Sequence, residues 1–328
     1  MPQPHQVENG TARLRSRGGR IGRHWRVFLA LALVAVAMGL GAVSTNALGA
    51  GDRFEGLVER IDRLIAGPVP ERSTRPTVAY TPPPVAAATS MPTPMPRATG
   101  PAPSRSAAVA TPTPAPTPTP LPARVAVDFT AVPSPADVFS HQATKDWCAV
   151  AGTQMVLAIH GKAPTSDAFQ QEIASRIKDW ESVQDSRNGN WGPAAMALAL
   201  DAYGVPGYEI RAYDTRADAL RDSARAIKAT GAPVVLLTWR GAHTWVMSGY
   251  RADADPSVFP DATVTGAYIL DPWYPWESNI WGQSDPPGAF QDAAEMERNY
   301  LAWKRPEGEY PDRDGKFIAV VPTLPLTR

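Results

Sequence analysis

A proline-rich segment ahead of the midpoint of the chain most limits where this sequence can fold. Residues 68–122 hold 17 of the 35 prolines, including the run TPTPAPTPTPLP, and almost no large apolar side chains. Such sequence cannot bury a hydrophobic core, and it favours extended, partly polyproline II conformations. We therefore expect a disordered Pro/Thr-rich linker here and a single folded domain in residues 123–328.

The residues before this linker have the pattern of a membrane anchor. Six arginines between Arg13 and Arg26 precede an uncharged apolar run over residues 27–51. About 20 apolar residues suffice to cross a bilayer as a helix, and the arginine-rich end stays in the cytoplasm. We expect residues 1–26 to form a cytoplasmic basic tail and residues 27–51 a transmembrane helix. The alternative is a signal sequence that is cleaved after export. Both interpretations place the C-terminal domain outside the cell, either on a single-pass cell-membrane protein or as a secreted one.

Residues 52–67 have apolar side chains at helical spacing and predict a short amphipathic helix beside the membrane. The whole chain carries 32 basic and 32 acidic residues. Because the net charge is zero, there is no overall basic field of the kind that attracts nucleic acid, and we expect no nucleic-acid partner. The sequence leaves the oligomeric state open.

The apolar pattern of the C-terminal segment changes from helical to strand-like along the chain. Spacing, capping residues and closing glycines predict helices over residues 148–160, 167–178, 192–204 and 217–231. Alternating or continuous apolar runs predict strands over residues 233–239, 243–250, 264–271 and 316–321. Helices followed by strands indicate an α+β domain, in which N-terminal helices pack on an antiparallel sheet.

The chain contains one cysteine, Cys148, at the start of the first predicted helix. An exported chain with a single cysteine makes no internal disulfide, so this thiol is either a buried inert side chain or a reactive one. Asp146 is the expected N-cap, and a thiol at the positive end of a helix dipole is stabilised as thiolate. Gln142 lies six residues upstream, and its side-chain amide can fold back toward the same helix start. With the backbone N–H of Cys148 it would offer two donors to a developing oxyanion.

A nucleophilic thiolate needs a base that works near neutral pH, and histidine is the side chain suited to this. The domain contains three histidines. His141 adjoins Gln142 and is expected to point away from the group that Gln142 serves. His160 lies about three turns along the helix from Cys148, beyond hydrogen-bond reach. His243 therefore remains as the candidate base.

A third candidate follows from the pairing of two predicted strands. If Tyr250 lies opposite Val264 in an antiparallel hairpin, the start of the first strand places His243 opposite Asp271. A carboxylate there would accept the second imidazole N–H and fix the tautomer of the base. The alternative is that Asp271, which precedes a proline, caps a turn.

The stretches QATKDWCAVAGTQM, GAHTWVMSGY and YILDPW, in this order, resemble the C39-like branch of the papain-like cysteine peptidases. The resemblance covers about residues 133–321 and implies a papain-like fold and a thiol peptidase that hydrolyses peptide amide bonds through an acyl-enzyme. By this resemblance Cys148 is the nucleophile, His243 is the base and acid, Asp271 orients the histidine, and Gln142 donates to the oxyanion.

One departure from the family pattern keeps other functions open. Members of the family usually carry glycine after the cysteine, whereas Ala149 stands here, and its methyl group either crowds the substrate backbone or is tolerated. A catalytically inactive surface-binding module with the same cleft is one alternative, and transfer of the acyl group to an amine is another. We expect a peptide or protein substrate, no metal and no cofactor.

Tryptophans form the last group of candidate site residues. They are expected either to wall a substrate groove or to pack in the core, and the set comprises Trp147, Trp191, Trp245, Trp273, Trp276 and Trp281. Trp147, Trp245 and Trp273 lie within two residues of the proposed catalytic side chains. We predict these three as substrate-binding residues.

Overall fold

The computed structural model of the chain describes residues 75–83, 122–180, 185, 191–304, 308 and 310–326. The predicted tail, transmembrane helix and amphipathic helix, over residues 1–67, lie outside the described residues. Within the described ranges, none of the helices has the length and apolar character needed to span a bilayer.

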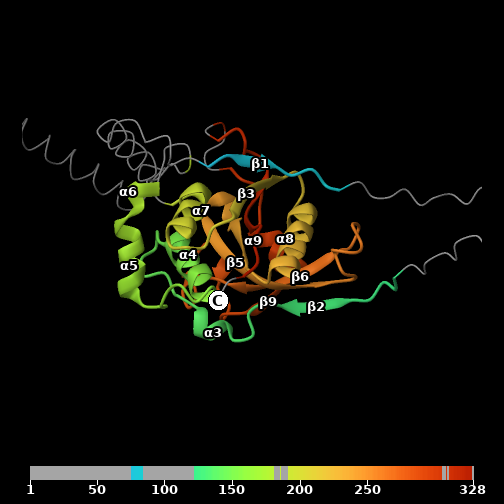
Figure 1. Cartoon of the computed structure of the whole chain (residues 1–328), viewed down its shortest axis with the longest axis horizontal. Coiled ribbons are helices and arrows are strands. Elements are labelled where there is room, and N and C mark those ends of the chain that lie inside the picture. Colours follow the sequence, from blue (N-terminus) through green and yellow to red (C-terminus); the bar gives the residue numbers. More distant parts are fainter. Residues whose placement is uncertain are drawn as a thin grey trace, which may run out of the picture. The chain divides into compact units, whose positions relative to one another are not determined.

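Helices are present at all four predicted positions (Figure 1). The helix predicted over residues 167–178 is divided in two, and residues 135–138 and 293–299 form short helices that were not predicted. The helices are α3 (Pro135–Val138), α4 (Cys148–Ile159), α5 (Asp167–Ser175), α6 (Ile177–Trp180), α7 (Pro193–Ala202), α8 (Arg216–Thr230) and α9 (Ala293–Asn299). Local capping explains the agreement. Ser166 and Thr215 accept hydrogen bonds from backbone N–H groups in the first turns of α5 and α8, and Gly231 ends α8 in the left-handed conformation.

Most strands form one mixed sheet in the order β1-β3-β10-β4-β5-β6-β9, and β2 pairs with the far end of β5. Their bounds are β1 (Thr77–Ala79), β2 (Val127–Thr130), β3 (Tyr208–Tyr213), β4 (Val234–Thr238), β5 (His243–Ala252), β6 (Val264–Leu270), β9 (Ala289–Asp292) and β10 (Phe317–Pro322). A separate hairpin joins β7 (Glu277–Ser278) to β8 (Gly282–Gln283). The four predicted strands are therefore present, and the sheet extends beyond them on both sides.

The structure corrects the prediction of a disordered linker for part of its length. Residues 77–79 form β1, which pairs in parallel with β3 at the edge of the sheet. The segment is held on both sides, because Arg75 forms an ion pair with Asp201 and the ring of Tyr80 lies 4.8 Å from that of Tyr213. Proline-rich composition did not reveal this strand, since its pairing partner lies more than 130 residues away.

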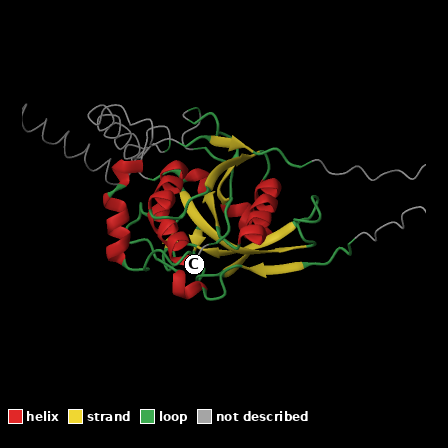
Figure 2. Cartoon of the chain, viewed as in Figure 1, coloured by secondary structure: helices red, strands yellow, loops and turns green. Residues whose placement is uncertain are grey.

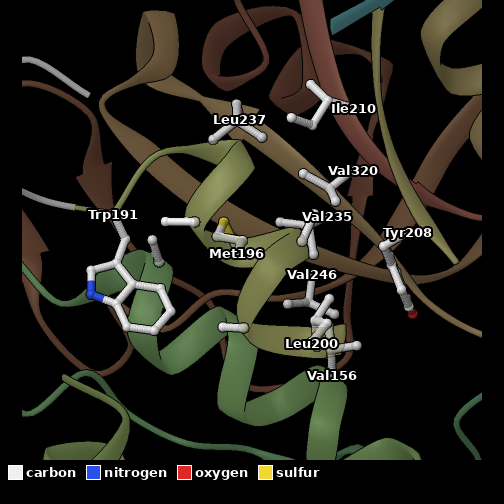
Figure 3. Close-up of a cluster of buried hydrophobic side chains, with 14 of the residues drawn as sticks. Val156, Trp191, Met196, Leu200, Tyr208, Ile210, Val235, Leu237, Val246 and Val320 are labelled. Atoms are coloured by element: carbon white, nitrogen blue, oxygen red, sulfur yellow. The ribbon is translucent and has the colours of Figure 1, made fainter. Parts of the chain in front are cut away.

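Helices cover both faces of the sheet (Figure 2). One core lies between the sheet and α4 and α7, and it contains side chains such as Val156, Leu200, Val235, Leu237 and Val246 (Figure 3). The second core lies under α8 and α9 and contains the intervening strand residues, such as Leu236 and Met247. Alternate residues of β4 and β5 thus enter different cores, which explains why these strands are apolar on both faces. The α+β prediction is confirmed, but the sheet is mixed and not purely antiparallel, because β1 runs parallel to β3.

The pairing of β5 with β6 differs from the predicted register. Val246 lies opposite Leu270 and Tyr250 opposite Ala267, with irregularities after Met247 and after Arg251. The predicted pairing of Tyr250 with Val264 was therefore wrong. Near the start of β5 the observed register differs from the predicted register by two residues. A shift by an even number of residues leaves every side chain on the same face of the sheet. This parity explains why the two proposed catalytic side chains still meet.

A close contact sets the distance between α4 and β5. Gly152 lies one turn after Cys148, and a Cβ atom on it would lie 2.7 Å from Cγ2 of Thr244, the residue after His243. Glycine lets the helix backbone approach the strand closely. The same contact positions the start of the helix beside the start of the strand.

Candidate active site

The site lies where one helix and two strands come together at one end of the sheet. Cys148 is the first residue of α4, His243 is the first residue of β5, and Asp271 directly follows the last residue of β6. Each side chain stands at the end of an element, so its backbone is fixed by secondary structure on one side.

His243 and Asp271 form a buried pair. The Nε2 atom of His243 lies 2.7 Å from Oδ1 of Asp271, and the two residues are only 3% and 6% exposed. The same Oδ1 accepts the backbone N–H of Trp273 at 2.9 Å. Asp271 therefore does what both sequence interpretations proposed, because it caps the turn after β6 and contacts the imidazole. The turn holds the carboxylate in place for the histidine.

The surroundings of His243 stabilise its protonated form. Burial by itself lowers the pKa of an imidazole, but the charge and hydrogen bond of Asp271 outweigh burial here. A hydrogen bond between His243 and Cys148 acts in the same direction, and together these contacts raise the pKa of His243 to about 9. An imidazolium at neutral pH beside a cysteine favours the thiolate of that cysteine.

Cys148 is half-buried and borders an open pocket. Its sulfur lies 3.9 Å from the carbonyl oxygen of Ala242, the residue before His243. The residue that caps α4 is Trp147, and no side chain caps this end of the helix. The expected cap, Asp146, was therefore wrong; it lines the pocket instead, because the chain turns into the helix one residue later than predicted.

The pocket beside Cys148 and His243 has a volume of about 320 Å³. Its walls are rich in tryptophan, with Trp191, Trp239, Trp273, Trp281 and Trp303 among the lining residues. Two of these, Trp239 and Trp303, were not predicted as site residues. Trp303 follows α9 and reaches the pocket only through the tertiary fold, so no local sequence pattern marks it.

Trp239 lies directly on the imidazole of His243. The two rings are stacked, with centroids 4.0 Å apart and planes 20° apart. The residue sits in the tight turn Trp239–Gly241 between β4 and β5, where its φ of 51° is unusual for a side chain of this size. Its Nε1 donates to Oδ1 of Asn299 at 2.9 Å, which holds the indole over the imidazole. Such strained backbone persists only where neighbouring contacts determine it.

Glycine is required at the end of the same turn. A Cβ atom at Gly241, whose φ is 89°, would lie 2.4 Å from the ring of Trp303. The turn that carries Trp239 is therefore packed directly against another pocket tryptophan.

A buried ion pair supports the wall of the pocket that contains Asp185. Oδ1 of Asp185 lies 3.1 Å from a guanidinium nitrogen of Arg313, and the Asp185 carboxylate also accepts the N–H groups of Ala194 and Ala195 at 2.8 Å each. These N–H groups belong to the first turn of α7, so the carboxylate caps that helix. Asp185 was missed by the sequence analysis because its partner lies 128 residues downstream.

Gln142 has a different contact from the one expected for an oxyanion donor. Its Nε2 donates hydrogen bonds to the carbonyl oxygens of Thr144 and Lys145, at 2.8 and 3.0 Å. Its backbone N–H donates to the carbonyl oxygen of Pro272. Both amide hydrogens thus hold the loop that leads into α4. The oxyanion role requires the amide to release one of these carbonyls, and it stays a prediction.

The three predicted substrate-binding tryptophans have three different environments. Trp273 lines the pocket and meets the imidazole of His243 edge-on. Trp147 packs at the edge of the core under α4 and is absent from the pocket lining. Trp245 is 3% exposed within the second core and is absent from the lining of this pocket, so its role as a substrate-binding residue has no support from the pocket and stays a prediction. β5 is covered on both faces, which removes the distinction between a buried and an open side of the strand.

The other residues that bore on the prediction are also placed. Nδ1 of His141 lies 2.7 Å from the carbonyl oxygen of Tyr274, and Nε2 of His160 lies 3.4 Å from the hydroxyl of Tyr208. Neither histidine lines the pocket. Ala149 is buried in the core and is also absent from the pocket lining, so its methyl group does not narrow this pocket.

Comparison with known protein families gives a match over about half of the chain. Residues 137–306 match the Peptidase_C39 like family, and this range contains Cys148, His243 and Asp271. No curated protein and no solved structure matches the chain.

Proposed function

Because the chain belongs to the C39-like peptidase family, which implies a cysteine peptidase acting on peptides or proteins, we propose that it hydrolyses peptide amide bonds with Cys148 as nucleophile. The observation that carries the proposal is the buried pair of His243 and Asp271, 2.7 Å apart, in hydrogen-bond contact with the only cysteine of the chain. Asp271 orients the imidazole, and His243 acts as acid and base.

The proposed reaction proceeds through an acyl-enzyme. The Cys148 thiolate attacks the carbonyl carbon, which forms a C–S bond and moves an electron pair onto the oxygen. The N–H of Cys148 stands at the N-terminus of α4, a position where backbone N–H groups bind negative oxygen. The His243 imidazolium then gives its proton to the leaving amine as the C–N bond breaks. In the second half, His243 takes a proton from water, the hydroxide attacks the thioester, and the thiolate leaves.

We also propose that the domain works outside the cytoplasm on a membrane tether. The support is the arginine-rich tail followed by the uncharged run over residues 27–51. Treatment of intact cells with an external protease tests this location. A domain that is digested only after the membrane is permeabilised would refute the extracytoplasmic location.

The function is tested by labelling and by turnover on the purified full chain. A single cysteine means that iodoacetamide reports on Cys148 alone. We expect labelling at pH 7 at least about tenfold faster than that of free cysteine, because the imidazolium favours the thiolate. A peptide library should be cleaved by the wild type and left intact by Cys148→Ala. Labelling no faster than free cysteine, or equal cleavage by both proteins, would refute the proposal. If an added amine captures the acyl group in preference to water, the enzyme is a transferase.

Gln142→Ala separates the two roles open to this side chain. Alkylation by iodoacetamide forms no oxyanion, whereas amide hydrolysis does. An oxyanion donor should lower peptide turnover by about 100-fold or more with little change in labelling rate. A role limited to holding the loop before α4 should lower both rates together.

A further inference from the structure

One exposed apolar side chain stands at the mouth of the catalytic pocket. Ile280 is 81% exposed, more than any other large apolar side chain of the described residues, and it lines the same pocket as Cys148 and His243. Leaving an isoleucine in water forgoes the free energy that its burial would release. Its position in the pocket lining leaves this surface available to a ligand that enters the pocket.

The hairpin that presents Ile280 is held in place by its own contacts. Glu277 pairs with Gln283, and the Ser278 hydroxyl accepts the N–H groups of Ile280 and Trp281 at 3.3 and 3.1 Å. The ring of Trp281 is parallel to that of Trp239, with 5.6 Å between centroids and 8° between planes. Since Trp239 stacks in turn on His243, an aromatic column joins the hairpin to the catalytic imidazole.

The charges around the pocket do not select a charged ligand. Lys145 and Asp146 have opposite signs and adjoin each other at the rim. The carboxylate of Asp185 is already matched by the Arg313 guanidinium and by two backbone N–H groups. What the walls offer in addition is apolar area, from the five tryptophans and Leu237.

We propose that this pocket takes a bulky apolar side chain of the substrate, of the leucine, methionine or phenylalanine class, from a residue next to the bond that Cys148 cleaves. The proposal rests on the proposed peptidase function and adds the substrate class. A volume of about 320 Å³ is at the lower end of the range for ligand sites, which fits one or two side chains. In this arrangement the ligand side chain covers Ile280 and packs against the tryptophan side chains that line the pocket.

The test uses a series of N-acetyl-aminoacyl chloromethyl ketones on the full chain. The Cys148 thiolate attacks the chloromethyl carbon, a C–S bond forms and chloride leaves, so the rate reports side-chain recognition next to the thiol. Dividing each rate by the iodoacetamide rate removes the intrinsic reactivity of the thiol. We expect this ratio to be at least about tenfold higher for phenylalanine and leucine than for alanine, lysine or aspartate.

Two matched variants locate the recognition. Ile280→Ser should lower the ratio for the phenylalanine reagent about fivefold, because the covered apolar surface is lost. Val258→Ser should leave the ratio within about twofold, because Val258 is also exposed, at 50%, and is not part of the pocket lining. Equal ratios for all reagents, or equal effects of the two variants, would overturn the proposal.

A second measurement keeps the substrate class separate from the catalytic proposal. Five tryptophans line the pocket, so ligand binding to Cys148→Ala should change tryptophan emission without any reaction. N-acetyl-phenylalanine amide should change it at concentrations at least about tenfold lower than N-acetyl-alanine amide. If N-acetylglucosamine oligomers bind and the apolar amide does not, the pocket is a sugar site and the proposal is wrong. Slow iodoacetamide labelling together with selective binding of the phenylalanine amide would refute the peptidase function alone.

Discussion

Replacing Asp271 by asparagine should reverse the pH dependence of stability that His243 confers. Asparagine keeps an oxygen that can accept the N–H of Trp273 and the Nε2–H of His243, so the turn after β6 is retained while the charge is lost. The pKa of His243 is raised from 6.5 to about 9 in the folded protein. At about 1.36 kcal/mol per pH unit, this difference corresponds to about 3 kcal/mol of folding free energy.

The sign follows from where the proton is held more tightly. Between pH 6.5 and about 9 the folded protein binds a proton at His243 that the unfolded chain has lost. The contribution is complete below pH 6.5, and it disappears as the pH rises through about 9. Without the Asp271 charge, burial dominates and lowers the pKa of His243, so the asparagine variant should instead lose stability as the pH falls.

The assay is denaturant unfolding between pH 5.5 and 9.5 in a Cys148→Ser background, which removes the titration of the thiol. We expect the free energy of unfolding of the background protein to fall across this range, by less than the value of about 3 kcal/mol for the wild type because the contribution of Cys148 to the His243 pKa is absent, and the Asp271→Asn variant in the same background to show no such fall. Parallel pH profiles for the two proteins, within about 1 kcal/mol, would refute the claim that Asp271 sets the charge of His243. In the wild type, peptidase activity should decline as the pH rises through about 9, because the imidazolium that protonates the leaving amine is lost.

Two further predictions concern the contacts that position the site. Gly152→Ala should destabilise the domain by about 1–3 kcal/mol in thermal unfolding, because the added methyl group meets Cγ2 of Thr244, although alanine is the better helix former. Adding Thr244→Ser, which removes the Cγ2 methyl group, should restore most of the lost stability. A Gly152→Ala protein that is more stable than the wild type would contradict the close approach of α4 to β5. Trp239→Leu should lower kcat/KM by about 10–100-fold with a smaller change in KM, because the imidazole of His243 loses the aromatic ring that holds it in position. Trp239→Phe keeps an aromatic ring and should retain most of the wild-type rate. Equal losses in the two variants would show that stacking on His243 is not the cause.

Much of the site was predictable because its signals are local or depend on chemical type. The helix that begins at the single cysteine could be recognised from the apolar spacing of residues 148–159 and from Gly161, which follows the end of the helix. His243 and Asp271 stand at the ends of strands that apolar runs mark plainly. Even the wrong register left them on one face, since the error was an even number of residues.

The sequence by itself determined the four longest helices, the principal strands and the identity of the thiol, histidine and carboxylate, because caps, turns and side-chain periodicity act over a few residues. The tertiary structure alone decided which tryptophans meet the pocket, where the Gln142 amide points, and that residues 77–79 complete the sheet. It also paired Asp185 with Arg313 and placed Trp239 on His243. These arrangements join residues far apart in the chain, and sequence spacing carries no information about contacts that form only when separate elements pack together.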